Sequence, residues 1–233
     1  MAVSVTPFSF VMKFLFGLVL LPVCVGIGVA TWRIFMAIPA SGASLFSAPH
    51  WAFFAGALLW MAIWIFCPRP FRIYVLGHEL THMLFGLLFG AKVGKLKVRK
   101  TGGSVSLSKD NLLISLSPYF FPFYTFLILL AYGIWHLISS PVPCEVVWHF
   151  VIGASWLFHL TFTISALSIR QSDVQAYGYL LSYTVIIAFN LLLMGLWIVC
   201  TTEISFFRYC VELADGIESI FASLVRLVRS VIR

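Results

Sequence analysis

The chain has 233 residues, of which 61% are hydrophobic and only 10% are charged, with a formal net charge of +7. Soluble domains have about a quarter of their residues charged, so this composition excludes an ordinary soluble protein and is typical of a polytopic membrane protein. The basic excess does not predict nucleic-acid binding, because no soluble basic domain carries it. Membrane orientation and anionic headgroups explain it instead.

Apolar runs of about 20 residues, long enough to cross a bilayer, recur along the chain. We therefore expect an all-α polytopic membrane protein with about six transmembrane helices in one domain, residues 1–233. The predicted spans cover residues 14–36, 51–67, 71–90, 112–138, 146–169 and 174–200.

The third predicted span contains the sequence Gly77-His78-Glu79-Leu80-Thr81-His82. Residues four apart lie one above the other on a helix, so His78 and His82 can direct two imidazoles at one ion. Glu79 occupies the position of the general base in the H-E-x-x-H arrangement. The motif predicts a zinc (Zn2+) site in the membrane with Glu79 as catalytic base. The alternative, a polar helix face in a structural or transport protein, leaves an ionised glutamate at mid-membrane without a compensating metal.

Residues 92–109 alternate in polarity on either side of Gly102-Gly103, which predicts a short membrane-associated β-hairpin. Leu96 and Val98 alternate with basic residues, and Val105 and Leu107 alternate with serines. The segment holds six basic residues, whereas residues 139–145 hold none, so the hairpin is expected on the cytoplasmic side.

Residues 204–233 predict an amphipathic C-terminal helix, either on the membrane surface or packed against the bundle. Six spans with a cytoplasmic hairpin leave both termini outside. The basic C-terminal helix instead favours the anionic cytoplasmic leaflet. The side of the termini therefore stays open at this point.

A catalytic zinc site usually has three protein ligands, so a third must join the two histidines. Asp173 is the best carboxylate, because it lies between two long apolar segments on the hairpin side of the membrane. Its structural alternative is a helix-end cap. His159 is the rival ligand, at a similar depth in the fifth span. Glu145 or Glu203 would make a gluzincin site, but both are expected on the opposite side.

The G-H-E-L-T-H sequence in an apolar helix, followed by a hairpin and a later aspartate, resembles the site-2 protease family of intramembrane zinc metalloproteases. The resemblance covers about residues 71–190. It implies that His78, His82 and Asp173 hold zinc and that Glu79 activates the bound water. The sequence departs from the family at Asp173, which is flanked by Ser172 and Val174, whereas the family usually has Asn-Pro-Asp-Gly or Leu-Asp-Gly.

The predicted hairpin resembles the family's membrane-associated β element, which is thought to present substrate as an added strand. An exposed strand edge can hold an extended peptide. The resemblance thus implies substrate contacts at Val105 and Leu107. Ser117 and Pro118, at the broken start of the fourth span, are further substrate-binding candidates, although a simple helix kink explains them equally well.

These patterns together predict a zinc-dependent metalloendopeptidase in the cell (inner) membrane, with its active site toward the cytoplasm. Its substrates are expected to be membrane-spanning or membrane-proximal proteins or peptides, and no nucleic-acid partner is expected. The competing class is a catalytically silent membrane transporter or binding protein with a structural metal site.

Overall fold

The computed structural model describes residues 7–38, 48–99, 102–138 and 144–232. The chain divides into two compact units, which are described separately. Unit 1 comprises Met1–Leu45 and Ser172–Arg233, and unit 2 comprises Phe46–Gln171. Unit 1 contains α1 (Pro7–Ala37), α7 (Ser172–Tyr177), α8 (Tyr179–Thr201) and α9 (Phe206–Ile232). Unit 2 contains α2 (Ala48–Phe66), α3 (Phe71–Leu88), β1 (Val93–Arg99), β2 (Gly102–Leu107), α4 (Leu112–Phe120), α5 (Phe123–Ile138) and α6 (Glu145–Leu167).

The predicted fold class is confirmed: the chain is an all-α polytopic membrane protein with one small hairpin. Among the described residues, four helices are long and apolar enough to cross a membrane, namely α1, α2, α6 and α8. A fifth span results if α4 and α5, which are bent by 76° at their junction, cross together. The predicted number of about six included α3, which carries Arg72, His78, Glu79 and His82 and is therefore less apolar.

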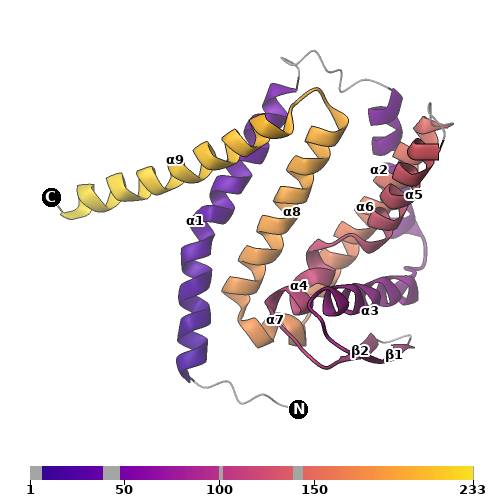
Figure 1. Cartoon of the computed structure of the whole chain (residues 1–233), viewed down its shortest axis with the longest axis horizontal. Helices are drawn as coiled ribbons and strands as arrows, with labels where there is room; N and C mark the ends of the chain where they lie inside the picture. The colour runs from indigo at the N-terminus through magenta and orange to yellow at the C-terminus, as the bar shows by residue number, and fades with distance from the viewer. Residues whose placement is uncertain (1–6, 39–47, 100–101, 139–143, 233) are drawn as a thin grey trace. The chain divides into compact units, whose positions relative to one another are not determined.

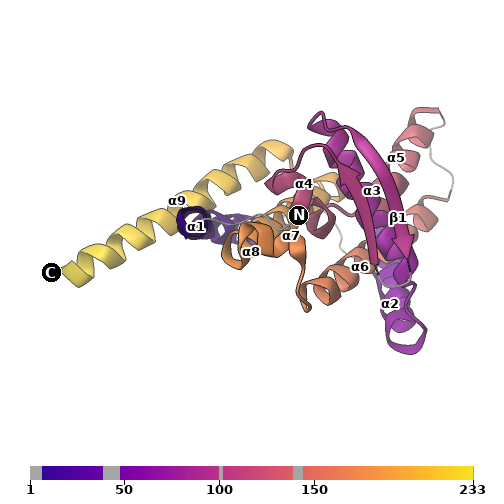
Figure 2. The same cartoon turned by 90° about the horizontal axis from the view of Figure 1, so that it is seen from below.

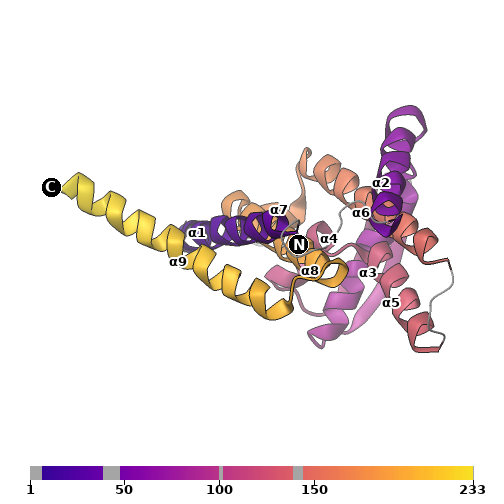
Figure 3. The ribbon, with the colours of Figure 1, turned by 90° about the horizontal axis from the view of Figure 1, so that it is seen from above.

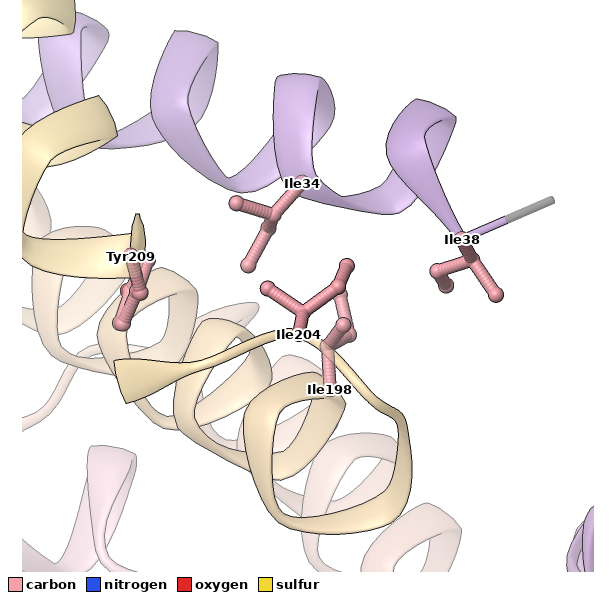
Figure 4. Close-up of a cluster of buried hydrophobic side chains, with 5 residues drawn as sticks. All are labelled: Ile34, Ile38, Ile198, Ile204 and Tyr209. Atoms are coloured by element: carbon pink, nitrogen blue, oxygen red, sulfur yellow. The ribbon is translucent and has the colours of Figure 1, made fainter. Parts of the chain in front are cut away.

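In unit 1, α1 packs along α8, and α9 crosses α1 (Figure 1). The crossing is close because Gly26 of α1 lies against the backbone of Ile217. Small residues at such a contact let two helix backbones approach each other. A buried apolar cluster joins the three helices near the start of α9 (Figure 4). Its members are Ile34, Ile38, Ile198, Ile204 and Tyr209.

The predicted sixth span, residues 174–200, is divided in the structure. Gly178 has a φ of +83°, a conformation that suits glycine, and separates the short helix α7 from α8. Asp173 therefore lies in the first turn of α7 rather than at the start of a continuous span. α9 is amphipathic as predicted, and its place on the membrane surface stays a prediction.

In unit 2, α2 and α6 run side by side (Figure 3). Their backbones touch at two glycines: a Cβ on Gly56 would meet the carbonyl oxygen of Phe150, and one on Gly153 would meet that of Phe53. Apolar side chains on these helices remain exposed, as expected for surfaces that face lipid. Leu58 is 70% exposed and Ile164 is 66% exposed. The α2–α6 pair thus supplies a membrane-spanning support for unit 2.

The predicted hairpin is present, as the antiparallel pair β1–β2, and it packs on α3 (Figure 2). Gly102 and Gly103 do not form its turn: Gly102 pairs with Arg99 and Gly103 with Val98 in the ladder. Residues 100–101, which connect the strands, lie outside the described residues. The sequence pattern located the hairpin but assigned both glycines to its turn, whereas both lie in β2, where Gly103 lies against Glu79 and Val75 of α3.

Candidate functional site

The two histidines of the motif lie together on α3, as the helical spacing predicts. Pro68 and Pro70 precede the helix, and Pro70 is its N-cap residue. The Nε2 atoms of His78 and His82 are 3.2 Å apart. Two imidazole nitrogens bound to one tetrahedral zinc at about 2.0–2.1 Å each lie roughly 3.3 Å apart. The pair therefore fits one zinc ion, and the same distance also suits an N–H···N hydrogen bond between the two rings.

The other nitrogen of each ring contacts a neighbouring group. His82 Nδ1 lies 2.8 Å from the carbonyl oxygen of Ile114 in α4. A carbonyl only accepts, so Nδ1 carries the proton and Nε2 presents its lone pair. His78 Nδ1 has a longer contact of 3.4 Å to the hydroxyl of Tyr74. Ligand histidines in metal sites are held in this way by partners of the nitrogen that does not bind the metal.

Neither partner was singled out from the sequence. Tyr74 stands four residues before His78, and this helical spacing is a signal that could have found it. Ile114 acts through its backbone, so its residue type carries no signal. Its proximity to His82 arises because α4 packs on α3.

Glu79 lies beneath strand β2. Its side chain is buried, with 6% exposure. A Cβ on Gly103 would come within 2.7 Å of the Cγ and Oε1 atoms of Glu79 and of a methyl group of Val75. Only a glycine therefore lets the strand lie this close to the expected catalytic base. The hairpin packs on the motif helix, and Gly103 lies directly against Glu79.

A small cavity adjoins the motif helix inside unit 2. Its volume is about 20 Å³, room for roughly one water molecule. His78 and Pro118 line it together with His159 of α6, whose side chain is 7% exposed. Among the described residues, His159 Nε2 has no hydrogen-bond partner. The rival ligand thus borders the same cavity as a motif histidine.

Asp173, the other predicted ligand, lies in unit 1, and the hydroxyl of Ser172 donates to its carboxylate over 3.3 Å. The two histidines lie in unit 2, so the assignment of Asp173 as zinc ligand stays a prediction. Glu145 begins α6 in unit 2, and Glu203 follows α8 in unit 1; both are exposed.

The predicted substrate-binding residues lie on two elements that pack on α3, namely β2 and α4. The side chain of Leu107 in β2 packs against Gly86 of α3, and Val105 pairs with Leu96. Ser117 is fully buried in α4, and Pro118 lines the small cavity. Their roles in substrate binding stay predictions.

Comparison with known proteins adds no family assignment. The chain matches no family model, no curated protein and no solved structure.

The identity of the third ligand can be tested by substituting the two candidates separately. We expect Asp173→Ala to lose most of the zinc that the wild-type protein retains, because a site left with two protein ligands binds zinc weakly. His159→Ala should keep its zinc. Metal content of the purified proteins, measured by atomic spectroscopy, checks both. If Asp173→Ala keeps its zinc and His159→Ala loses it, His159 is the ligand.

Proposed function

We propose that this chain is an intramembrane zinc metalloendopeptidase of the site-2 protease type. It hydrolyses peptide bonds of membrane-spanning or membrane-proximal substrates. His78, His82 and Asp173 hold the zinc, and Glu79 is the general base. The proposal places the protein in the inner membrane with the site facing the cytoplasm, as the basic hairpin favours.

The observation that carries this proposal is the arrangement of the two imidazoles. Their Nε2 atoms are 3.2 Å apart, which fits two ligands of one ion. His82 Nδ1–H donates a hydrogen bond to the Ile114 carbonyl, so the lone pair of this ring is on Nε2. Glu79, the next residue after His78, supplies a buried carboxylate beside this pair.

The chemistry divides between the metal and the side chains. Zinc, when bound, polarises the scissile carbonyl and makes a water molecule acidic enough to lose a proton near neutral pH. Glu79 takes that proton as the water oxygen forms its bond to the carbonyl carbon. Glu79 then gives the proton to the leaving nitrogen as the carbon–nitrogen bond breaks. The products are a carboxylic acid and an amine, so the atoms of one water molecule are consumed.

The hairpin supports a role in presenting substrate. Its strands pack on α3, with β2 directly over Glu79 at Gly103. A substrate segment must be unwound before cleavage, because hydrogen bonds within a helix shield its peptide bonds. Extended peptides bind to the free edges of strands, and a hairpin has such edges.

The test combines metal content with cleavage of a single-span reporter by the purified protein in lipid vesicles. Wild-type protein is expected to hold about one zinc per chain, to lose cleavage on treatment with a chelator and to regain it with added zinc. His82→Ala should lose both zinc and cleavage. His136→Ala, an exposed histidine of α5, is the matched control and should lose neither.

Two outcomes contradict the proposal. Wild-type protein that holds no zinc refutes the metal site. Zinc bound at the motif without metal-dependent cleavage of any single-span reporter favours the silent transporter or binding protein instead.

A further inference from the structure

Pro118 interrupts the hydrogen-bond pattern of α4 at one carbonyl. In an α-helix each N–H donates to the carbonyl four residues earlier, and proline has no N–H. The carbonyl that Pro118 leaves without its helical donor is that of Ile114. The pattern continues on both sides: Ser115 N donates to Asn111 O over 2.9 Å, and Phe121 N donates to Ser117 O over 2.8 Å.

The freed carbonyl is used by two side chains. His82 Nδ1 donates to Ile114 O over 2.8 Å, and the hydroxyl of Ser117 donates to the same oxygen over 3.0 Å. Ile114 is buried, with 1% exposure. A buried carbonyl needs a hydrogen-bond donor, and an oxygen with two lone pairs accommodates both. A proline ring also presses on the carbonyl four residues earlier and tilts it away from the helix axis.

The segment that carries this carbonyl is fixed at its start. Asn111 is the N-cap of α4, and its side chain accepts from Ile114 N over 2.8 Å. The hydroxyl of Ser115 donates to Asp110 over 2.7 Å. Every residue of α4 from Ile114 to Phe120 is buried. The Ile114 carbonyl that faces His82 is therefore held in place by the hydrogen bonds of Ile114 N and of the Ser115 hydroxyl.

We propose that Pro118 is a positioning residue for the metal site. By withholding its N–H, it leaves the Ile114 carbonyl free to hold His82 with the proton on Nδ1 and the lone pair on Nε2. This contact favours the tautomer with the proton on Nδ1 over the tautomer with the proton on Nε2. The inference rests on the proposed zinc site, and it assigns a function to a proline that a simple helix kink would otherwise explain.

The test restores the missing N–H. Pro118→Ala and Pro118→Val each give residue 118 a donor that can recapture Ile114 O. Loss of the hydrogen bond made by the other ring nitrogen of a ligand histidine typically lowers metal affinity about 10–100-fold. We expect a decrease in zinc affinity within this range for both variants. Zinc affinity is measured by competition with a chelator. The melting temperature of the metal-free protein should not fall, because proline is unfavourable inside a helix.

Three comparisons isolate the cause. Pro22→Ala also replaces a proline inside a helix, α1, and should leave zinc affinity unchanged. Pro118 also lines the small cavity, and alanine enlarges that cavity, whereas valine keeps the three side-chain carbons of proline. Ser117→Ala removes the second donor to Ile114 O and should change zinc affinity less than about twofold, because His82 keeps its contact.

The outcomes separate this inference from the proposed function. If wild-type protein binds zinc and both Pro118 variants bind it as tightly as Pro22→Ala, the inference is wrong and the zinc site stands. Weakening by alanine alone assigns the effect to the cavity and also overturns the inference. Nitrogen-15 NMR of histidine-labelled, zinc-loaded wild-type protein gives a test independent of any variant: a proton on Nε2 of His82, with Nδ1 bare, refutes it. Wild-type protein without zinc refutes the proposed function itself.

Discussion

Replacing Glu79 by glutamine is expected to remove peptide cleavage while zinc stays bound. Glutamine has nearly the same shape, but its amide cannot take a proton from water. General base catalysis contributes about 10²–10⁴-fold to a rate, so we expect a loss of at least 100-fold. Zinc content should equal that of the wild-type protein, because Glu79 is not among the proposed ligands. Cleavage of the single-span reporter and metal content, measured on the same preparations, check both expectations.

The matched control for this change is Glu218→Gln. It makes the same chemical substitution on α9 and should keep both zinc and cleavage. Full cleavage by Glu79→Gln would exclude Glu79 as the base. Loss of zinc along with cleavage would assign the glutamate to metal binding and leave the base to be found elsewhere.

Replacing Gly103 by alanine is expected to lower cleavage about 100-fold without removing zinc. A Cβ at this position comes within 2.7 Å of Glu79 and Val75, so either the strand or the carboxylate must move. A displacement of about 1 Å at a reacting group can cost 100-fold in rate. Overpacking of this kind also typically costs about 1–3 kcal/mol of stability. His82 is held by a different contact, from its Nδ1 to the Ile114 carbonyl of α4, so metal content should not change.

Gly133→Ala is the control for this prediction. Gly133 lies in α5, where an added Cβ meets nothing within 4 Å among the described residues. Alanine is also the better helix former, so this variant should fold at least as stably as the wild type and keep full cleavage. Equal activity of the Gly103 and Gly133 variants would show that β2 can shift without disturbing the catalytic base.

Glu79 on α3 and Gly103 on β2 contribute different properties to the same site. The Glu79 variant tests whether the carboxylate is the general base. The Gly103 variant tests whether the hairpin must lie against that carboxylate for peptide cleavage. A loss in the first with none in the second would leave the catalytic mechanism intact and remove the hairpin from it.

The sequence by itself determined the membrane class, the hairpin and the pairing of His78 with His82. These features depend on local periodicity: long apolar runs fix the spans, alternation fixes the strands, and a four-residue spacing fixes one face of a helix. It also located the break in the fourth span, because proline cannot continue a helix without losing a hydrogen bond. α4 and α5 are separated at Phe121-Pro122, at the end of the interruption predicted over residues 117–122, whereas Pro118 lies inside α4.

Only the tertiary structure decided what surrounds the motif. Two contacts depend on how the hairpin and α4 pack on α3: Gly103 lies over Glu79, and the Ile114 carbonyl accepts a hydrogen bond from His82 Nδ1. Neither contact follows from spacing along the chain. A pair of glycines is equally typical of a turn, and a contact made by a backbone oxygen leaves no mark on the residue type. A proline inside a helix indicates that the carbonyl four residues earlier lacks its helical donor. Which side chain takes that carbonyl depends on packing between segments that are more than 30 residues apart.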